Sequence, residues 1–323
     1  MEARPRDFCI SCVVPVHDEA ANLPAFIPAL YRQLVALCPR VEIIVVNDGS
    51  RDDSLALLQV LAPAFGLCVL DLSRNFGKEA ALTAGLDQAR GDVVLLIDAD
   101  FQHPIDAIPA LLAKWREGYD MVYGQRNGRA GDGWWRRRGT ALFYYLMNRG
   151  SVVAIPEDAG DFRLMDRCVV DALRALPERT RFMKGLYAWV GFRSVAVPFP
   201  VQLRQGGRSS FSLGALSRLA LTGLLSFSDL PLRIWSMLGF IIALLALGYG
   251  GLLLLEAWYD GVTVPGWATL AVSLMFFSGV QLISVGILGE YLARVFSEVK
   301  QRPTYIVARR LDHSPLAAPV ARE

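Results

Sequence analysis

The sequence predicts an α/β domain with a doubly wound, mostly parallel sheet, followed by a membrane-associated region. Over residues 8–123, continuous apolar strands alternate with helical segments, which is typical of a parallel sheet covered on both faces. Each of these strands ends in polar or glycine-containing sequence. Two long apolar runs without charged residues lie between residues 234 and 289. These three observations predict a catalytic or binding domain that is held at a bilayer.

The elements of the α/β domain follow from hydrophobic runs and helix signals. The predicted strands cover residues 8–15, 42–46, 68–72, 93–97 and 120–123. The predicted helices cover residues 20–37, 50–61, 78–89 and 104–117. Ser50 with Asp53 three residues later fits a capping box at the start of the second helix, and Gly91 ends the third.

The strand at residues 93–97 ends in two carboxylates, Asp98 and Asp100. In open α/β sheets, ligands bind beyond the carboxyl ends of the strands. Two acids at that place need a cation, and oxygen ligands of this kind suit Mg²⁺ or Mn²⁺. A polar turn would show the same short pattern, so the surrounding residues decide between the two interpretations.

Other polar side chains follow the neighbouring strands, and we expect them to converge on the same edge of the sheet: Glu19, Asp48, Lys78 and Arg126. A carboxylate at a strand end can accept a hydrogen bond from a ribose hydroxyl or a base. A lysine and an arginine there can bind phosphates. The sequence contains neither a G-x-x-x-x-G-K-[ST] nor a G-x-G-x-x-G motif, which disfavours P-loop and dinucleotide-binding functions.

Composition narrows the class of protein further. A net charge of +2 over 323 residues gives no reason to expect a nucleic-acid partner. The pair Cys9 and Cys12 has redox or zinc spacing, but it lies in an apolar run without a second Cys/His pair. We therefore expect all five cysteines to be core thiols in a reducing compartment. Residues 1–7 are polar and lead into a strand, so no signal peptide is expected.

Six motifs in order resemble the family 2 glycosyltransferases of GT-A fold. They are Val-Pro-Val-His-Asp-Glu at 14–19, Val-Asn-Asp-Gly-Ser at 46–50, Asn-Phe-Gly-Lys at 75–78, Asp-Ala-Asp-Phe-Gln-His-Pro at 98–104, Gly-Asp-Phe-Arg-Leu at 160–164 and Arg-Phe-Met-Lys-Gly-Leu at 181–186. The last two are similar to the polyprenyl-phosphate branch, near dolichol-phosphate mannose synthase and the bactoprenol glucosyltransferases. The resemblance extends from about residue 8 to the end of the chain.

The resemblance implies roles at matching positions. It implies that a nucleotide sugar is bound along the strand ends by Pro15, His17, Glu19, Asp48, Lys78, Asp98, Ala99 and Gln102. It implies a Mg²⁺ or Mn²⁺ site at Asp98, Asp100 and Gln102, with Asp100 and Asp161 as catalytic residues. The phosphate of the acceptor is expected to contact four arginines: Arg126, Arg138, Arg204 and Arg208.

Three positions depart from the family pattern. His17 stands where the family usually has tyrosine, Asn47 where it often has aspartate, and Ser210 where a lysine is expected. The basic, aromatic run at 129–138 is either a solvated loop or a loop that faces lipid headgroups, and the membrane segments that follow favour the second interpretation.

The sequence predicts five consecutive regions: a glycosyltransferase domain at 1–211, an interfacial amphipathic helix region at 212–233, transmembrane helices at 234–255 and 266–289, and a cytoplasmic tail at 290–323. The loop between the helices carries acids but no Lys or Arg, while basic residues flank both helices on their other sides. The positive-inside rule therefore places the catalytic domain and both termini in the cytoplasm. We expect the residues after Leu311 to be disordered.

The resemblance implies inverting transfer of a sugar to polyprenyl (undecaprenyl) phosphate at the bacterial inner membrane, by a homo-oligomer that is expected to be a tetramer. It favours UDP-glucose as donor, with GDP-mannose and UDP-N-acetylglucosamine as alternatives. A non-catalytic membrane scaffold that binds nucleotide sugars is a further alternative. A processive polysaccharide synthase is disfavoured, because the Gln-x-x-Arg-Trp motif and additional membrane spans are missing.

Overall fold

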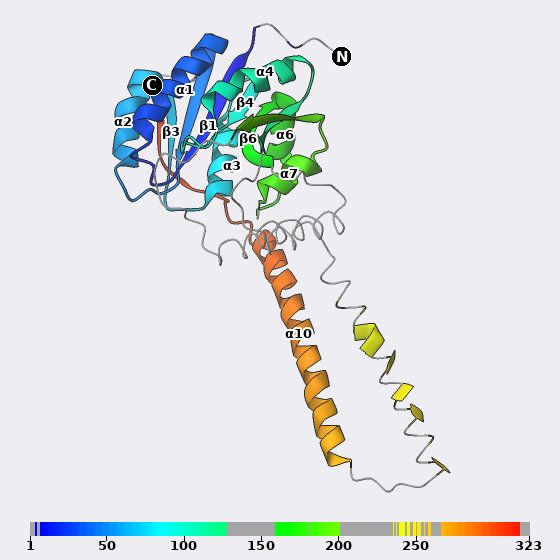
Figure 1. The fold of residues 1–323 in the computed structure, drawn as a ribbon. Helices are drawn as coiled ribbons and strands as arrows, with labels where there is room; N and C mark the ends of the chain where they lie inside the picture. The colour runs from blue at the N-terminus through cyan, green and yellow to red at the C-terminus, as the bar shows by residue number, and fades with distance from the viewer. Residues whose placement is uncertain are drawn as a thin grey trace.

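Among its described residues, the computed structural model of the chain contains an α/β domain and a long helix, α10, that projects from it (Figure 1). The structure describes residue 4 and residues 7–127, 159–179, 181–200 and 266–316, with scattered positions between 235 and 259. The interfacial region at 212–233 therefore lies outside the described residues, and the first expected transmembrane helix, at 234–255, is described only at scattered positions.

The α/β domain is built on an eight-stranded mixed sheet of order β7-β5-β6-β4-β1-β2-β3-β8. The strands β1 to β4 are parallel, β5 and β7 are parallel to each other, and β6 and β8 run antiparallel to their neighbours. Their bounds are Cys9–Val16, Arg40–Asn47, Leu67–Leu72, Val93–Leu96, Met121–Asn127, Ala159–Asp166, Ser194–Pro200 and Val307–Asp312 for β1 to β8. The predicted doubly wound, mostly parallel sheet is confirmed.

Helices cover both faces of this sheet, and each face has its own apolar core. One layer contains α1 (Leu23–Leu37), α2 (Ser54–Phe65), the short 3₁₀ helix η1 (Ile105–Ala107) and α4 (Ile108–Arg116). The other contains α3 (Lys78–Gln88), α6 (Arg167–Ala175) and α7 (Met183–Trp189). Alternate β1 residues serve the two cores, with Cys12 and Val14 in the first and Val13 in the second. This arrangement explains why the strands are apolar without alternation.

The predicted capping box at the start of α2 is wrong. Asp53 is the N-cap residue, but its side chain accepts no capping hydrogen bond. The Ser50 hydroxyl instead donates to Asn47 Oδ1 at 2.5 Å and accepts from the Asp18 amide at 3.0 Å. Ser50 therefore ties together the turns after β1 and β2, and α2 begins four residues later at Ser54.

The cysteine prediction is largely confirmed. Cys9, Cys12, Cys38 and Cys68 are free thiols buried in the domain. Cys168, in the first turn of α6, is exposed, so it is not the core residue that we expected. Because all five thiols are free in the described structure, the spacing of Cys9 and Cys12 reflects strand packing.

Helix α10 (Trp267–Val299) contains the second expected transmembrane segment. Its part Phe276–Val299 has a mean hydropathy of 1.4 and none of it is buried against the protein. Among the described residues, this is the one helix long and apolar enough to cross a bilayer. A helix with this much exposed apolar surface needs a partner other than water.

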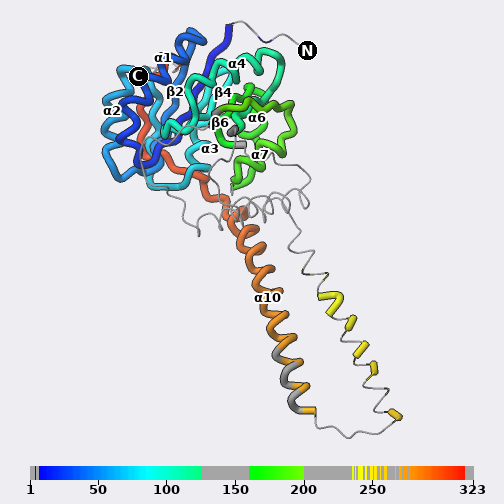
Figure 2. The backbone as a smooth tube through the Cα atoms, viewed as in Figure 1, coloured from blue at the N-terminus to red at the C-terminus, as the bar shows by residue number. Residues whose placement is uncertain are grey.

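The chain after α10 returns to the α/β domain, so the expectation of disorder after Leu311 is wrong for residues 311–316. Figure 2 shows this returning segment beside β3. Strand β8 pairs antiparallel with β3, with Asp312 opposite Cys68 and Arg309 opposite Asp71. The preceding residues are also held, because the Ser73 amide donates to the Ile306 carbonyl at 2.9 Å. The predicted tail therefore includes an edge strand of the sheet.

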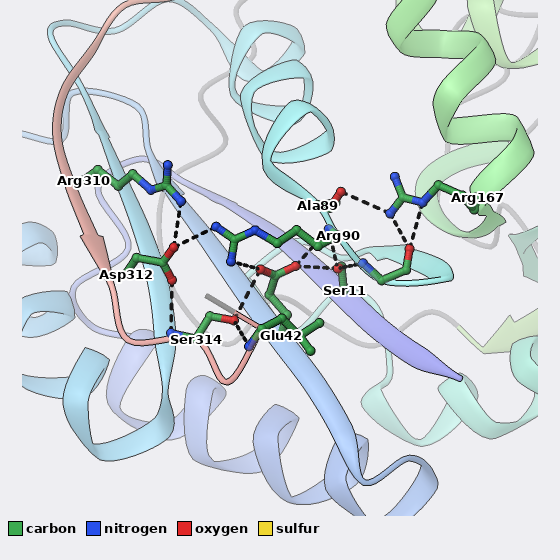
Figure 3. A network of polar contacts seen from close by, with 10 residues as sticks. Ser11, Glu42, Ala89, Arg90, Arg167, Arg310, Asp312 and Ser314 are labelled. Atoms are coloured by element: carbon green, nitrogen blue, oxygen red, sulfur yellow. Dashed lines mark hydrogen bonds and ion pairs between the residues drawn. The ribbon is translucent and has the colours of Figure 1, made fainter. Parts of the chain in front are cut away.

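A buried polar network fastens β8 to the interior of the domain (Figure 3). Glu42, in β2, is fully buried and accepts from the Ser11 hydroxyl at 2.6 Å and from the Ser314 hydroxyl at 3.3 Å. Arg90 lies between Glu42 and Asp312, at 3.3 Å and 2.9 Å from their carboxylates. The network lies at the amino ends of β1, β2 and β4, opposite the edge that carries the candidate site.

Candidate functional site

The candidate site lies at the carboxyl ends of β1 to β4, where the structure joins Asp98, Lys78 and Asp161. The ammonium group of Lys78, the first residue of α3, lies 2.8 Å from Asp98 Oδ2 and 2.9 Å from Asp161 Oδ2. Asp161 reaches this edge because β6 is antiparallel to β4, with Arg163 opposite Leu96. The beginning of β6 therefore meets the end of β4, and two carboxylates share one cation.

The charges of this cluster shift the pKa values of its members. Burial acts to raise the pKa of the Asp161 carboxyl, but Lys78 and Lys184 outweigh it and lower the pKa to about 2. Burial acts to lower the pKa of the Lys78 ammonium, but Asp98 and Asp161 hold it above its ordinary value. Asp161 is therefore ionised and Lys78 is charged at neutral pH.

The turn that follows β4 brings Asp100 and Gln102 together. The backbone amide of Gln102 donates to Asp100 Oδ1 at 3.0 Å, and Ala99 is buried. Phe101, between these two residues, has a φ of 59°, a left-handed conformation that is uncommon for a bulky side chain. Such strain concentrates at functional sites, where the surrounding structure imposes it.

The donor chemistry of this edge fits a divalent cation that prefers oxygen ligands. Asp98, Asp100 and Asp161 offer carboxylate oxygens, and Asp161 Oδ1 is buried without a hydrogen bond to the described part of the chain. The described part of the chain contains no cluster of three or more His, Cys, Asp or Glu side chains that could hold a metal by protein groups alone. Mg²⁺ commonly binds one or two protein carboxylates and completes its coordination with water and substrate phosphates, which fits this arrangement.

Asp48, at the end of β2, organises the loop that leads to Lys78. Its two carboxylate oxygens accept the Phe76 amide at 2.7 Å and the Gly77 amide at 2.9 Å. The next residue, Gly49, has a φ of 60°, and a Cβ there would lie 2.4 Å from the backbone of Arg74. The two loops are therefore in direct backbone contact, and Asp48 fixes the position at which α3 begins.

The remaining predicted nucleotide-binding residues surround this loop. His17 Nδ1 lies 2.8 Å from the Asp48 carbonyl oxygen, and His17 Nε2 lies 3.0 Å from Asn75 Nδ2. Pro15 is one residue from the end of β1 and pairs in register with Val46. Glu19 accepts from the Asn22 side chain at 2.5 Å at the start of α1. The structure thus brings His17 and Asp48 into one contact network, with Pro15 and Glu19 on the same edge.

The structure places only one of the four predicted acceptor-phosphate arginines. Arg126 lies near the end of β5, opposite Phe199 of β7. Arg138, Arg204 and Arg208 lie outside the described residues, as does the basic run at 129–138. The prediction that these four side chains act together therefore stays a prediction.

No role was predicted from the sequence for several polar residues that lie near Asp161. Burial, and then the Asp161 carboxylate, raise the pKa of Glu79 to about 7, and Glu79 accepts the Met183 amide at 3.1 Å. The guanidinium of Arg163 lies 3.9 Å from the ring centroid of Tyr187, and both residues are buried. The available signal was positional: Glu79 follows Lys78 directly, and Arg163 lies two residues after Asp161.

Comparisons with known proteins show the family to which the chain belongs. The family model described as glycosyl transferase family 2 matches residues 11–174. An uncharacterized glycosyltransferase of Synechocystis, sll0501, is 48% identical over 300 residues, which cover 93% of this chain and 94% of that protein. The SfII prophage-derived bactoprenol glucosyl transferase of Shigella flexneri is 44% identical over 302 residues, which cover 93% of this chain and 97% of that protein.

Among the solved structures similar to this chain is that of glucosyl-3-phosphoglycerate synthase from Mycobacterium tuberculosis, in complex with Mn²⁺, UDP and glucosyl-3-phosphoglycerate. The two sequences are 24% identical, and the match covers 68% of this chain and 79% of the synthase chain with a TM-score of 0.46.

Proposed function

Because the chain belongs to glycosyl transferase family 2, we propose that it transfers a sugar from a nucleotide diphosphate to a polyprenyl phosphate, with inversion at the anomeric carbon. Relatives that match nearly the whole chain are named bactoprenol glucosyl transferases, which supports a polyprenyl phosphate acceptor and glucose as the sugar. UDP-glucose is the proposed donor. The product would serve as a lipid-linked sugar donor for glycans of the cell envelope.

The observation that carries this proposal is the bridge from Asp98 through Lys78 to Asp161. It joins the carboxylate at the end of β4 to a second carboxylate on β6, within 2.9 Å of a shared ammonium group. Ligands of open α/β sheets bind beyond the carboxyl ends of the strands, which supports Asp98 and Asp100 as the residues near the nucleotide diphosphate. Asp161 lies on the adjacent strand, where a sugar attached to that diphosphate would be placed.

We assign the metal site to Asp98 and Asp100, with Gln102 as a further contact to the metal or to phosphate. A Mg²⁺ or Mn²⁺ ion bound there would neutralise charge that develops on the departing diphosphate. Asp98 and Asp100 would supply the oxygen ligands for it, and Lys78 provides a positive charge beside Asp98. Asp48, His17, Pro15 and Glu19 are the proposed contacts of the nucleoside.

The chemistry of the acceptor explains why Asp161 need not remove a proton. A phosphate monoester has its second pKa near about 6, so its oxygen is largely deprotonated at neutral pH and can attack the anomeric carbon directly. Asp161, with a pKa of about 2, remains ionised. Its negative charge is suited to holding the neighbouring cation Lys78 in place, which can orient the acceptor phosphate. The same charge is suited to stabilising positive charge at the anomeric centre.

The proposed enzyme is membrane-bound. Helix α10 provides one span, and the apolar run at 234–255 is the proposed second one, so that the catalytic domain and both termini lie in the cytoplasm. The cytoplasmic side is also where the free thiols would stay reduced. Small residues in both spans permit close helix contacts, and a homo-oligomer, with a tetramer as the expected form, is part of the proposal.

Replacing Asp100 by asparagine tests the proposed site. The substitution preserves the size of the side chain and its contact with the Gln102 amide, but it removes the charge. We expect Asp100→Asn to lose transfer from UDP-[¹⁴C]glucose to undecaprenyl phosphate by at least about a hundred-fold, with an unchanged melting temperature. Asp106→Asn, an exposed change in η1, is the matched control and should keep parental activity. Near-parental transfer by Asp100→Asn would show that the site is assigned wrongly.

A further inference from the structure

A basic cleft lies beside the candidate site, at the end of α10 that joins the α/β domain. Its volume is about 510 Å³. The walls come from the loop before α3, from the segment before α7, and from the last turn of α10 with the residues that follow it. We propose that this cleft captures the phosphate group of the lipid acceptor at the membrane surface, before the phosphate reaches Asp161.

The charge of the cleft favours a ligand with more than one negative charge. Five cationic side chains line it, and Glu79 is the one acid among the lining residues that the structure describes; the cations are Arg74, Arg179, Arg181, Lys300 and Arg302. None of the five forms an ion pair with a described carboxylate. Arg181 donates to the carbonyls of Leu176 and Glu178, which fixes its position but leaves its charge uncompensated.

Hydrogen bonds at three places hold the walls of the cleft together. The Arg179 amide donates to both carboxylate oxygens of Glu298, at 3.0 and 3.1 Å, and so joins the segment before α7 to α10. The Tyr305 hydroxyl donates to Asp87 at 2.8 Å and joins the residues after α10 to α3. Glu79 accepts the Met183 amide. The cationic side chains therefore project from walls that these hydrogen bonds hold in place.

The position of the cleft specifies a lipid rather than a soluble phosphate. Helix α10, with its exposed apolar surface over Phe276–Val299, ends at the cleft, so an acyl or prenyl chain can lie along the helix while its headgroup enters the cleft. A phosphate monoester carries a charge of about −1.5 to −2 at neutral pH, and guanidinium groups match its oxygens in a bidentate manner. A phospholipid diester carries less charge and would leave more of the cations unpaired.

The cleft is also next to the reaction centre. Glu79 lines it, and Lys78, the preceding residue, contacts both Asp98 and Asp161. A phosphate held by Arg74 and Arg181 would therefore have a short path to Asp161. This capture site is distinct from the four arginines Arg126, Arg138, Arg204 and Arg208, and the inference rests on the proposed lipid acceptor.

The test uses the full-length protein in detergent and a double variant, Arg179→Gln with Arg302→Gln. The control, Arg40→Gln with Arg116→Gln, removes two exposed positive charges at the opposite edge of the sheet. Direct binding is measured with radiolabelled undecaprenyl phosphate, with undecaprenol and phosphatidylglycerol as competitors. The KM for undecaprenyl phosphate and the Kd for UDP are measured on the same preparations.

We expect the double variant to bind undecaprenyl phosphate about ten-fold more weakly and to show a similar rise in KM, with an unchanged Kd for UDP. Undecaprenol and phosphatidylglycerol should compete poorly with the labelled lipid. The inference is overturned if the double variant matches the control in binding and KM, or if phosphatidylglycerol competes as well as undecaprenyl phosphate. It is also overturned if the parent does not bind undecaprenyl phosphate.

The proposed function can fail separately. A parent protein that binds undecaprenyl phosphate but transfers no sugar to it would refute the proposed reaction. In that case the capture site is supported if the double variant loses lipid binding and refuted if it does not.

Discussion

Replacing Glu42 by glutamine should both destabilise the domain and release the C-terminal strand. Glu42 is fully buried, and each of its oxygens has two donors. Oε2 accepts the Ser11 hydroxyl and the Arg90 amide, at 2.6 and 3.1 Å. Oε1 accepts the Arg90 guanidinium and the Ser314 hydroxyl, each at 3.3 Å. An amide nitrogen in place of Oε2 would face two donors, because the Ser11 hydroxyl oxygen already accepts two backbone amides, and one in place of Oε1 would face the Arg90 guanidinium.

The size of the effect follows from these contacts. One or two lost hydrogen bonds account for about 0.5–3 kcal/mol, and removal of one partner of a buried ion pair costs about 3–5 kcal/mol where the other partner is left unpaired. Arg90 keeps its contact with Asp312 at 2.9 Å and is partly exposed, so we expect a total loss of about 3 kcal/mol. For a domain of this size, that corresponds to a fall in melting temperature of about 6–12 °C.

Two assays measure this prediction. Thermal unfolding in detergent gives the melting temperature, and limited trypsin digestion reports cleavage after Arg309 and Arg310, which are protected while β8 pairs with β3. The control is Glu117→Gln, because Glu117 is an exposed residue whose pair with Lys114 is expected to contribute about 0–1 kcal/mol. If Glu42→Gln has the same melting temperature as the control and is cleaved by trypsin at the same rate, the network does not hold β8 in the sheet.

Three further changes test the site and its support. Burial and Asp161 raise the pKa of Glu79 from 4.5 to about 7, so the folded state binds a proton more tightly than the unfolded state. The stability of the metal-free protein should therefore fall as pH rises from 5 to about 8, and Glu79→Gln should remove this fall in melting temperature. Asp48→Asn loses one of two backbone contacts and should weaken UDP binding about ten-fold in calorimetric titration, with little change in fold by circular dichroism. Gly85→Ala would place a Cβ 2.1 Å from Val13 Cγ1 and should lower stability by about 1–3 kcal/mol in thermal unfolding, whereas Gly279→Ala, which meets nothing within 4 Å on α10, should not.

Much of the first half of the fold follows from local sequence. Strands β1 to β5 and helices α1 to α4 were predictable because apolar runs buried on both faces alternate with helical segments. The placement of Asp98 and Asp100 followed from the same pattern, since a parallel strand ends at the ligand-binding edge. Lys78 was predictable as a residue of that edge, but its contact with two carboxylates was not.

The remainder depends on contacts between residues distant in sequence. Asp161 reached the site through β6, whose antiparallel pairing with β4 no local pattern indicates, so only the family resemblance pointed to it. Strand β8 was missed because Val307–Asp312 contains two arginines and is largely exposed, as suits an edge strand that must not pair further. Glu79 was missed because its pKa depends on Asp161, which lies on another element.

The most direct measurement of the proposed reaction is sugar transfer by the purified protein in detergent. Undecaprenyl phosphate and Mg²⁺ or Mn²⁺ are supplied with labelled UDP-glucose, GDP-mannose or UDP-N-acetylglucosamine, and a parallel sample contains a metal chelator. We predict labelled lipid from UDP-glucose alone and none in the chelated sample. No labelled lipid from any donor, by protein that still binds UDP, would contradict the proposed function.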